Sequence, residues 1–158
     1  MEEDIQKSRP EQIRVPLSVM GDNIPAWLSR DSGWGYTEND PVLILSDNES
    51  EGVENEYKFA NIRSNIEVQY VLKMHYMGLE RKGQSLVHRN GKPYDIIKFD
   101  VLLLSDEDWN FLKDDYESHN GYQDDADGLQ RHRQMRAERI RYYSSECWID
   151  ISAFFGKN

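Results

Sequence analysis

The dipeptide Asn90-Gly91 narrows the possible folds of this chain more than any other part of its sequence. Asn and Gly both tolerate positive φ, so this dipeptide is the strongest short-range signal for a two-residue β-hairpin. It lies between the partly apolar runs 85–88 and 94–97, and the second run continues into an apolar stretch that ends at Leu104. The sequence therefore predicts an antiparallel hairpin in the middle of the chain.

Further strands are expected before and after this hairpin. Apolar residues alternate with more polar ones over 66–74, the two-residue period that is typical of a half-buried strand. The run 57–62 would pair with that strand across a turn at 63–65, which gives an antiparallel meander over about 57–104. Shorter strands are expected at 13–19, at 41–45 and at 149–155.

Two helices are expected in the C-terminal half. Ser105 followed by Asp108 resembles a capping box, and acids in the first turn suit the helix dipole, so a helix should begin at Asp106. A second helix, rich in arginine, is expected from about 129 to 143. By contrast, the acidic segment 46–56 has no period and is predicted to be a solvated loop.

These patterns predict an α+β fold. The sheet would be mainly antiparallel, with the meander at about 57–104 and flanking strands, and the two C-terminal helices would pack on it. The length of 158 residues is that of one folding unit. We expect a loose N-terminal segment at 1–12, which is polar and has no period, followed by a single domain at 13–158.

The charge of the chain restricts its partners and its compartment. The 29 acids and 19 bases give a net charge of −10, and this field repels the phosphates of DNA and RNA. We therefore expect no direct nucleic-acid binding. From the acidic first residues we expect no export signal, and no apolar run is long enough for a membrane span. The one cysteine, Cys147, cannot form an intrachain disulfide. A soluble, cytoplasmic protein that does not bind membranes fits these features.

Motifs for catalysis are weak in this sequence. The loop 123–128 resembles part of a calcium-binding loop, but Gln123 and Gln134 stand where the strongest ligands are needed. Glu56 and Lys58 match the acid-x-Lys element of some metal-dependent nucleases, a pattern that is common by chance in so charged a chain. No motif nominates a catalytic residue, a metal site or a cofactor, and we expect none.

The segment 114–127 is the most informative candidate site. It combines six acids with two tyrosines and contains no Lys or Arg. Carboxylates steer a cationic partner, and tyrosine offers contact area at a low entropy cost. Alternatively, the arginines of 131–141 could fold back and neutralise these acids within the domain. The predicted partner-binding residues are Asp114, Asp115, Tyr116, Glu117, Tyr122, Asp124, Asp125 and Asp127.

The preferred hypothesis is an acidic, non-enzymatic binding protein that inhibits a basic protein partner. An immunity protein for a toxin and a small anti-defence inhibitor are the concrete cases. One alternative is a metal-dependent hydrolase whose carboxylates are scattered over several strands. Another is a self-assembling scaffold subunit that pairs through the strand near Val15 or through the arginine-rich helix. The sequence leaves the partner and the oligomeric state open.

Overall fold

The hairpin at Asn90-Gly91 is confirmed. The computed structural model describes residues 10–157, and in it the strand β2 (His75–Arg89) turns directly into β3 (Lys92–Leu104). Asn90 and Gly91 both have positive φ, 52° and 78°, as a two-residue turn of this kind requires. The two strands pair in antiparallel register from His75 and Leu104 to Arg89 and Lys92.

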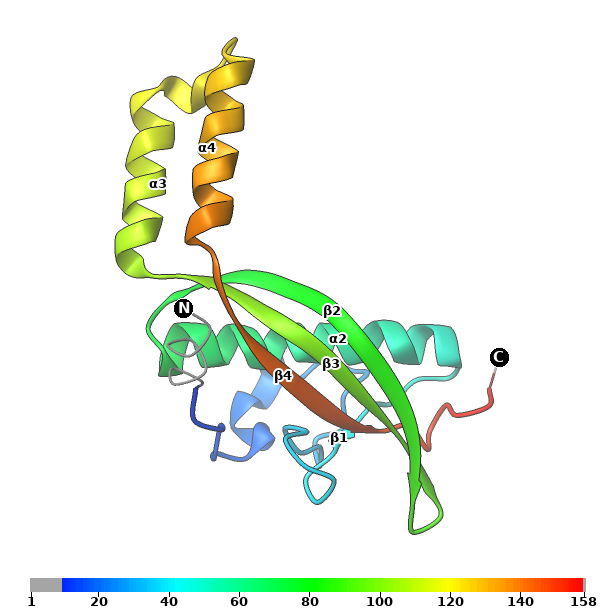
Figure 1. Ribbon diagram of the computed structural model, residues 1–158. Coiled ribbons are helices and arrows are strands. Elements are labelled where there is room, and N and C mark those ends of the chain that lie inside the picture. Colours follow the sequence, from blue (N-terminus) through cyan, green and yellow to red (C-terminus); the bar gives the residue numbers. More distant parts are fainter. Residues whose placement is uncertain (1–9, 158) are drawn as a thin grey trace.

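The remaining strands complete a mixed sheet in an α+β fold (Figure 1). β4 (Arg141–Asp150) pairs antiparallel with β3, and its C-terminal end pairs in parallel with the short β1 (Val42–Leu43). The sheet order is β1-β4-β3-β2. The strand expected at 41–45 is thus present, whereas the last strand lies earlier than the expected 149–155.

One long helix replaces the loop and the first strands of the expected meander. Most of the predicted loop at 46–56, from Glu49 on, and the whole predicted strand at 57–62 belong to α2 (Glu49–Ile66). The helix is capped by Asn48, whose side chain accepts from the Glu51 amide at 3.0 Å. It continues as a π-helix, η2 (Glu67–Val71), so the prediction of a strand at 66–74 was also wrong.

The buried face of α2 explains this error. The helix lies along one face of the sheet (Figure 1), and the side chains that it buries recur three or four residues apart, as on any packed helix. Many of them are polar, so they do not form an apolar stripe in the sequence. The buried residues of α2 and of the first turn of η2 include Asn55, Glu56, Phe59, Ala60, Arg63, Ser64, Glu67 and Val68.

The C-terminal helices form a hairpin of their own. α3 (Asp106–Ser118) and α4 (Ala126–Arg139) run antiparallel, with the short η3 (Asn120–Tyr122) between them. They continue beyond the end of the sheet instead of covering its face, which is covered by α2 (Figure 1). α3 begins at Asp106, as predicted, with Ser105 Oγ accepting from the Asp108 amide at 3.1 Å.

The N-terminal part contains no strand at 13–19. It forms a 3-10 helix, η1 (Leu17–Asn23), directly after Pro16. The expected edge strand near Val15 is therefore wrong, and with it one of the two elements through which self-assembly was expected, the other being the arginine-rich helix. Of the segment predicted to be loose, 1–9 lie outside the described residues.

Within 10–157, no helix is both long enough and apolar enough to cross a membrane.

Candidate functional site

The predicted partner-binding residues lie together at the free end of the α3–α4 hairpin, which we call the hairpin tip. The tip comprises residues 114–127: the last turn of α3, η3 and the first residues of α4. It is the part of the hairpin that lies farthest from the sheet (Figure 1). The sequence segment that looked most like a binding face is therefore also the most prominent projection of the molecule.

Asp115 organises the tip from within. Its Oδ2 accepts from the Tyr122 hydroxyl at 2.7 Å and from His132 Nδ1 at 2.8 Å. The hydrogen bond from His132, followed by that from Tyr122, lowers the pKa of Asp115 because both favour its charged form. His119 Nδ1 donates to the Asp115 carbonyl at 2.7 Å, and its ring stacks on Tyr122. Asp115 and Tyr122 therefore hold the turn together.

This support matters because the turn has an unusual backbone. Asn120, Gly121 and Tyr122 have φ values of 52°, 69° and 56°, and Asp124 has 60°. Such left-handed conformations are unfavourable for residues other than glycine and persist only where surrounding contacts impose them. The network around Asp115 provides contacts of that kind.

Most of the other acids of the tip point to solvent. Asp114, Glu117, Asp124 and Asp127 are exposed, and none of them forms an ion pair within 4.0 Å in the described part of the chain. Asp125 instead caps α4 by accepting from the Gly128 amide at 2.9 Å.

Among residues 10–157, no arginine of α4 forms an ion pair within 4.0 Å with an acid of the tip. The ion pair that joins α3 to α4 through an arginine is Arg139 with Asp108 at 3.7 Å, near the base of the hairpin. Tyr116 is 46% exposed, and its ring lies 5.4 Å from that of His132. The tip thus presents free carboxylates and one half-exposed aromatic ring.

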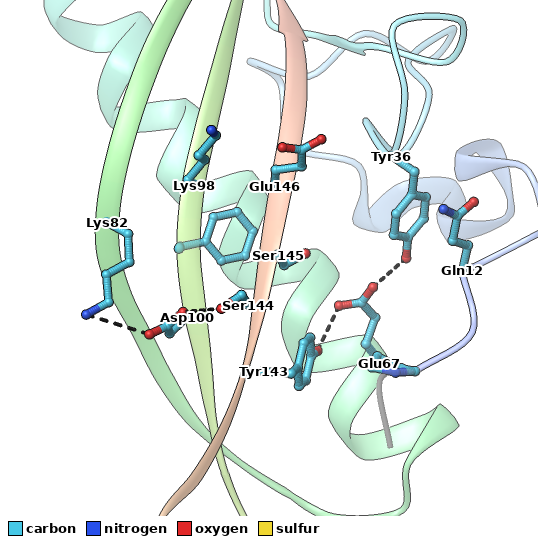
Figure 2. Close-up of a pocket in the computed structure, with 12 residues that line it drawn as sticks. Gln12, Tyr36, Glu67, Lys82, Lys98, Asp100, Tyr143, Ser144, Ser145 and Glu146 are labelled. Carbon is cyan, nitrogen blue, oxygen red and sulfur yellow. Dashed lines mark hydrogen bonds and ion pairs between the residues drawn. The ribbon is translucent and has the colours of Figure 1, made fainter. Parts of the chain in front are cut away.

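A second site was not predicted from the sequence. A cavity of about 680 Å³ lies beside β4, between the N-terminal segment and the strands β2, β3 and β4 (Figure 2). This volume is within the roughly 300–1,000 Å³ of small-molecule sites. Its lining residues are Pro10, Gln12, Tyr36, Glu67, Lys82, Lys98, Phe99, Asp100, Tyr143, Ser144, Ser145 and Glu146.

A buried carboxylate lies at the inner side of this cavity. Glu67 is 2% exposed, and its two oxygens accept from two phenols, Tyr36 at 2.6 Å and Tyr143 at 2.9 Å (Figure 2). Burial, and then the charge of Glu67, raises the pKa of both tyrosines. They therefore stay protonated at neutral pH and keep donating to Glu67.

Arg63 fixes the wall behind this carboxylate. Its guanidinium is fully buried and donates to the Trp34 carbonyl, to Ser145 Oγ at 2.9 Å and to the Glu146 carbonyl at 2.6 Å. It also lies over the Tyr36 ring, 4.3 Å from its centre. Arg63 and Glu67 are one helical turn apart, so α2 and the π-helix place both charges towards the same strand.

A wall formed by the strands β2, β3 and β4 carries further polar side chains that line the cavity. Lys82 Nζ lies 3.6 Å from Asp100 Oδ2, and Ser144 Oγ donates to Asp100 Oδ1 at 2.9 Å. Next to them, Lys98 and Glu146 are direct cross-strand neighbours on β3 and β4. Acids and bases are therefore evenly matched along this wall.

Sequence reasoning missed the cavity because its residues are far apart in the chain. Tyr36 and Tyr143 reach Glu67 across 31 and 76 positions. Glu67 itself was placed on the solvent side of a strand that does not exist. The one available signal was the loop 33–36, in which two aromatic residues alternate with glycines. Trp34 is 4% exposed and anchors this loop in the core, while Tyr36 lines the cavity.

The other residues that the sequence offered for catalysis or metal binding do not form a site. Glu56 is buried and Lys58 is exposed, so this acid and this lysine do not share a site. Cys147 is fully buried, as expected of a small core residue, and burial raises its pKa to about 11. In the range 10–157, no three His, Cys, Asp or Glu side chains are grouped so that they could hold a metal ion.

Comparison with known proteins adds no further information, because no protein-family model, curated protein or solved structure matches this chain.

Proposed function

We propose that this chain is a non-enzymatic binding protein that inhibits a basic protein partner through the hairpin tip. The observation that carries this proposal is the group of exposed acids, Asp114, Glu117, Asp124 and Asp127, at the end of a helical arm. These carboxylates lack ion-pair partners among residues 10–157, so they are available to arginines and lysines of another molecule.

The shape of the arm supports the same function. An arm that extends beyond the sheet can enter a concave, positively charged surface, such as the substrate cleft of a nuclease. Tyr116, half-exposed among the carboxylates, would supply contact area. An immunity protein for a toxin and an inhibitor of a defence enzyme are the concrete cases that combine these features.

Affinity capture with matched variants tests the proposal. The tip variant carries Asp114→Asn, Glu117→Gln, Asp124→Asn and Asp127→Asn, which spare the structural residues Asp115 and Asp125. The control variant has four exposed acids away from the hairpin neutralised: Asp22→Asn, Asp31→Asn, Glu51→Gln and Glu54→Gln.

The readout is the binding of a captured protein to the purified chain. We expect a basic protein that binds the wild type and the control variant equally, and binds the tip variant at least about tenfold more weakly, which corresponds to about 1.4 kcal/mol. Its affinity should fall as salt is added, because exposed charges are screened. Equal binding of the tip variant would show that the tip is not the interface.

A further inference from the structure

Two buried charged side chains lie at the inner side of the cavity beside β4, and their burial is costly. Arg63 and Glu67 are both buried, at 0% and 2% exposure. Buried charges lose their hydration, and replacing such a pair by apolar residues of similar size is often neutral or stabilising. A buried polar group that borders a cavity is therefore better explained by what it binds than by stability.

The charged residues around the cavity are three acids and three bases, when Arg63, which is buried behind Glu67, is counted with the five charged lining residues. Glu67 has Arg63 one turn away on the same helix, and Asp100 is paired with Lys82 at 3.6 Å. Glu146 stands opposite Lys98 in the strand register. An anion or a cation entering the cavity would meet repulsive and attractive charges in equal number, so this site favours a ligand without net charge.

The polar atoms that face the cavity can both donate and accept hydrogen bonds. Each Glu67 oxygen accepts one phenol hydrogen and has capacity for a second donor. The phenol oxygen of Tyr143, which donates to Glu67, can in turn accept. Ser145 Oγ accepts from Arg63, so its own hydrogen remains to be donated. A matching ligand must therefore donate and accept at neighbouring atoms, as a chain or ring of hydroxyl groups does.

We propose that this cavity binds a small, neutral, hydroxyl-rich ligand of the sugar or polyol class, with Glu67, Tyr143 and Ser145 as its hydrogen-bonding groups. The proposal does not depend on the function of the hairpin tip. The side chain of Pro10, which also lines the cavity, offers apolar surface to the C–H face of such a ligand.

An NMR titration of the full chain tests the proposal, with D-glucose, D-ribose and mannitol as neutral probes, and inorganic phosphate and putrescine as charged probes. We expect at least one neutral probe to shift the amide signals of 143–146 and of Tyr36, and neither charged probe to do so. Shifts from a charged probe alone would show that the site takes an ion. The absence of shifts from all probes would show that the cavity is not a site of this kind.

Variants assign the binding to the named groups. Glu67→Gln should weaken the binding of the neutral probe by about tenfold, the value of one or two buried hydrogen bonds. Glu54→Gln, the same change at an exposed position of α2, should leave it unchanged. Should Glu67→Gln fail to fold, Ser145→Ala replaces it with the same expected loss. Wild-type affinity in the folded variant would remove Glu67 or Ser145 from the site and overturn the assignment.

Discussion

Glu56 is a buried acid that the fold keeps protonated. It is fully buried on α2, and neither of its oxygens receives a hydrogen bond from a donor within 10–157. Burial, followed by a hydrogen bond with Asp95, raises its pKa to about 10. Asp95 also accepts from Gln84 Nε2 at 2.9 Å, so the proton shared by the two acids belongs on Glu56.

This arrangement predicts a pH-dependent stability. The unfolded chain releases the Glu56 proton near its ordinary pKa of 4.5, whereas the folded protein keeps it up to about pH 10. The folded state binds more protons across that range, so the free energy of unfolding falls as the pH rises. Between pH 4.5 and 7 the loss is on the order of 3 kcal/mol.

Glu56→Gln should remove this loss, because Gln can donate to Asp95 without carrying a proton that titrates. We expect the variant to be more stable than the wild type at neutral and alkaline pH. Urea unfolding at several pH values between about 5 and 9 measures the difference. Glu54→Gln serves as the exposed control, and parallel pH profiles for wild type and Glu56→Gln would contradict the prediction.

The contribution of Asp115 to stability depends on pH in the opposite direction to that of Glu56. Its lowered pKa means that the charged form is favoured in the folded state, so its contribution is present at neutral pH and is lost as the pH falls through the lowered value. Asp115→Asn should weaken the bonds to Tyr122 and His132 and destabilise the turn by about 1 kcal/mol. Faster amide exchange in 116–132 but not in the sheet is the expected result, and Asp114→Asn is the matched control.

At the level of elements, the sequence predicted structure well wherever local signals decide it. The turn at Asn90-Gly91 and the cap at Ser105 depend on residues within a few positions of each other, and both are present. The long helix α2 and its continuation η2 were missed because their buried face contains charged residues, Glu56, Arg63 and Glu67. The hydrogen-bond partners of Arg63 and Glu67 lie far away in the chain. The composition of the acidic tip could be read from the sequence. Predicting the cavity would have required knowing the register of strands that are distant in the chain.

The packing of α2 gives a further prediction. A Cβ added to Gly52 would lie 2.3 Å from the ring of Phe154, which is itself buried. Gly52→Ala should therefore destabilise the protein by about 1–3 kcal/mol, although alanine is the better helix former. Gly83→Ala in β2 is the control, because nothing lies within 4 Å of its added Cβ. Denaturant unfolding of both variants measures the difference, and equal stability would contradict the close contact.

At the scale of the whole molecule, the α3–α4 hairpin is separable from the core. The strands that flank it are already paired, with Leu103 opposite Arg141, and α2 covers the sheet without it. The hairpin itself buries little, mainly Leu112 and Gly128.

Replacing 106–139 by a short glycine-containing turn should therefore leave the sheet and the cavity folded. The stacking of His75 on Trp109 would be lost, which should lower the stability only modestly. Far-UV circular dichroism should show less helix, while the amide signals of β2, β3 and β4 keep their positions. Loss of cooperative unfolding would show that the hairpin is part of the folding unit.

The length of the hairpin also determines how its tip can influence the rest of the protein. The 14 residues of α4 span about 20 Å, and the Debye length at physiological ionic strength is about 8 Å. The charge of a partner bound at the tip is therefore largely screened before it reaches the residues beyond the base of the hairpin. Any communication between the two ends would have to be mechanical, by movement of the arm about its attachments at Ser105 and Ile140.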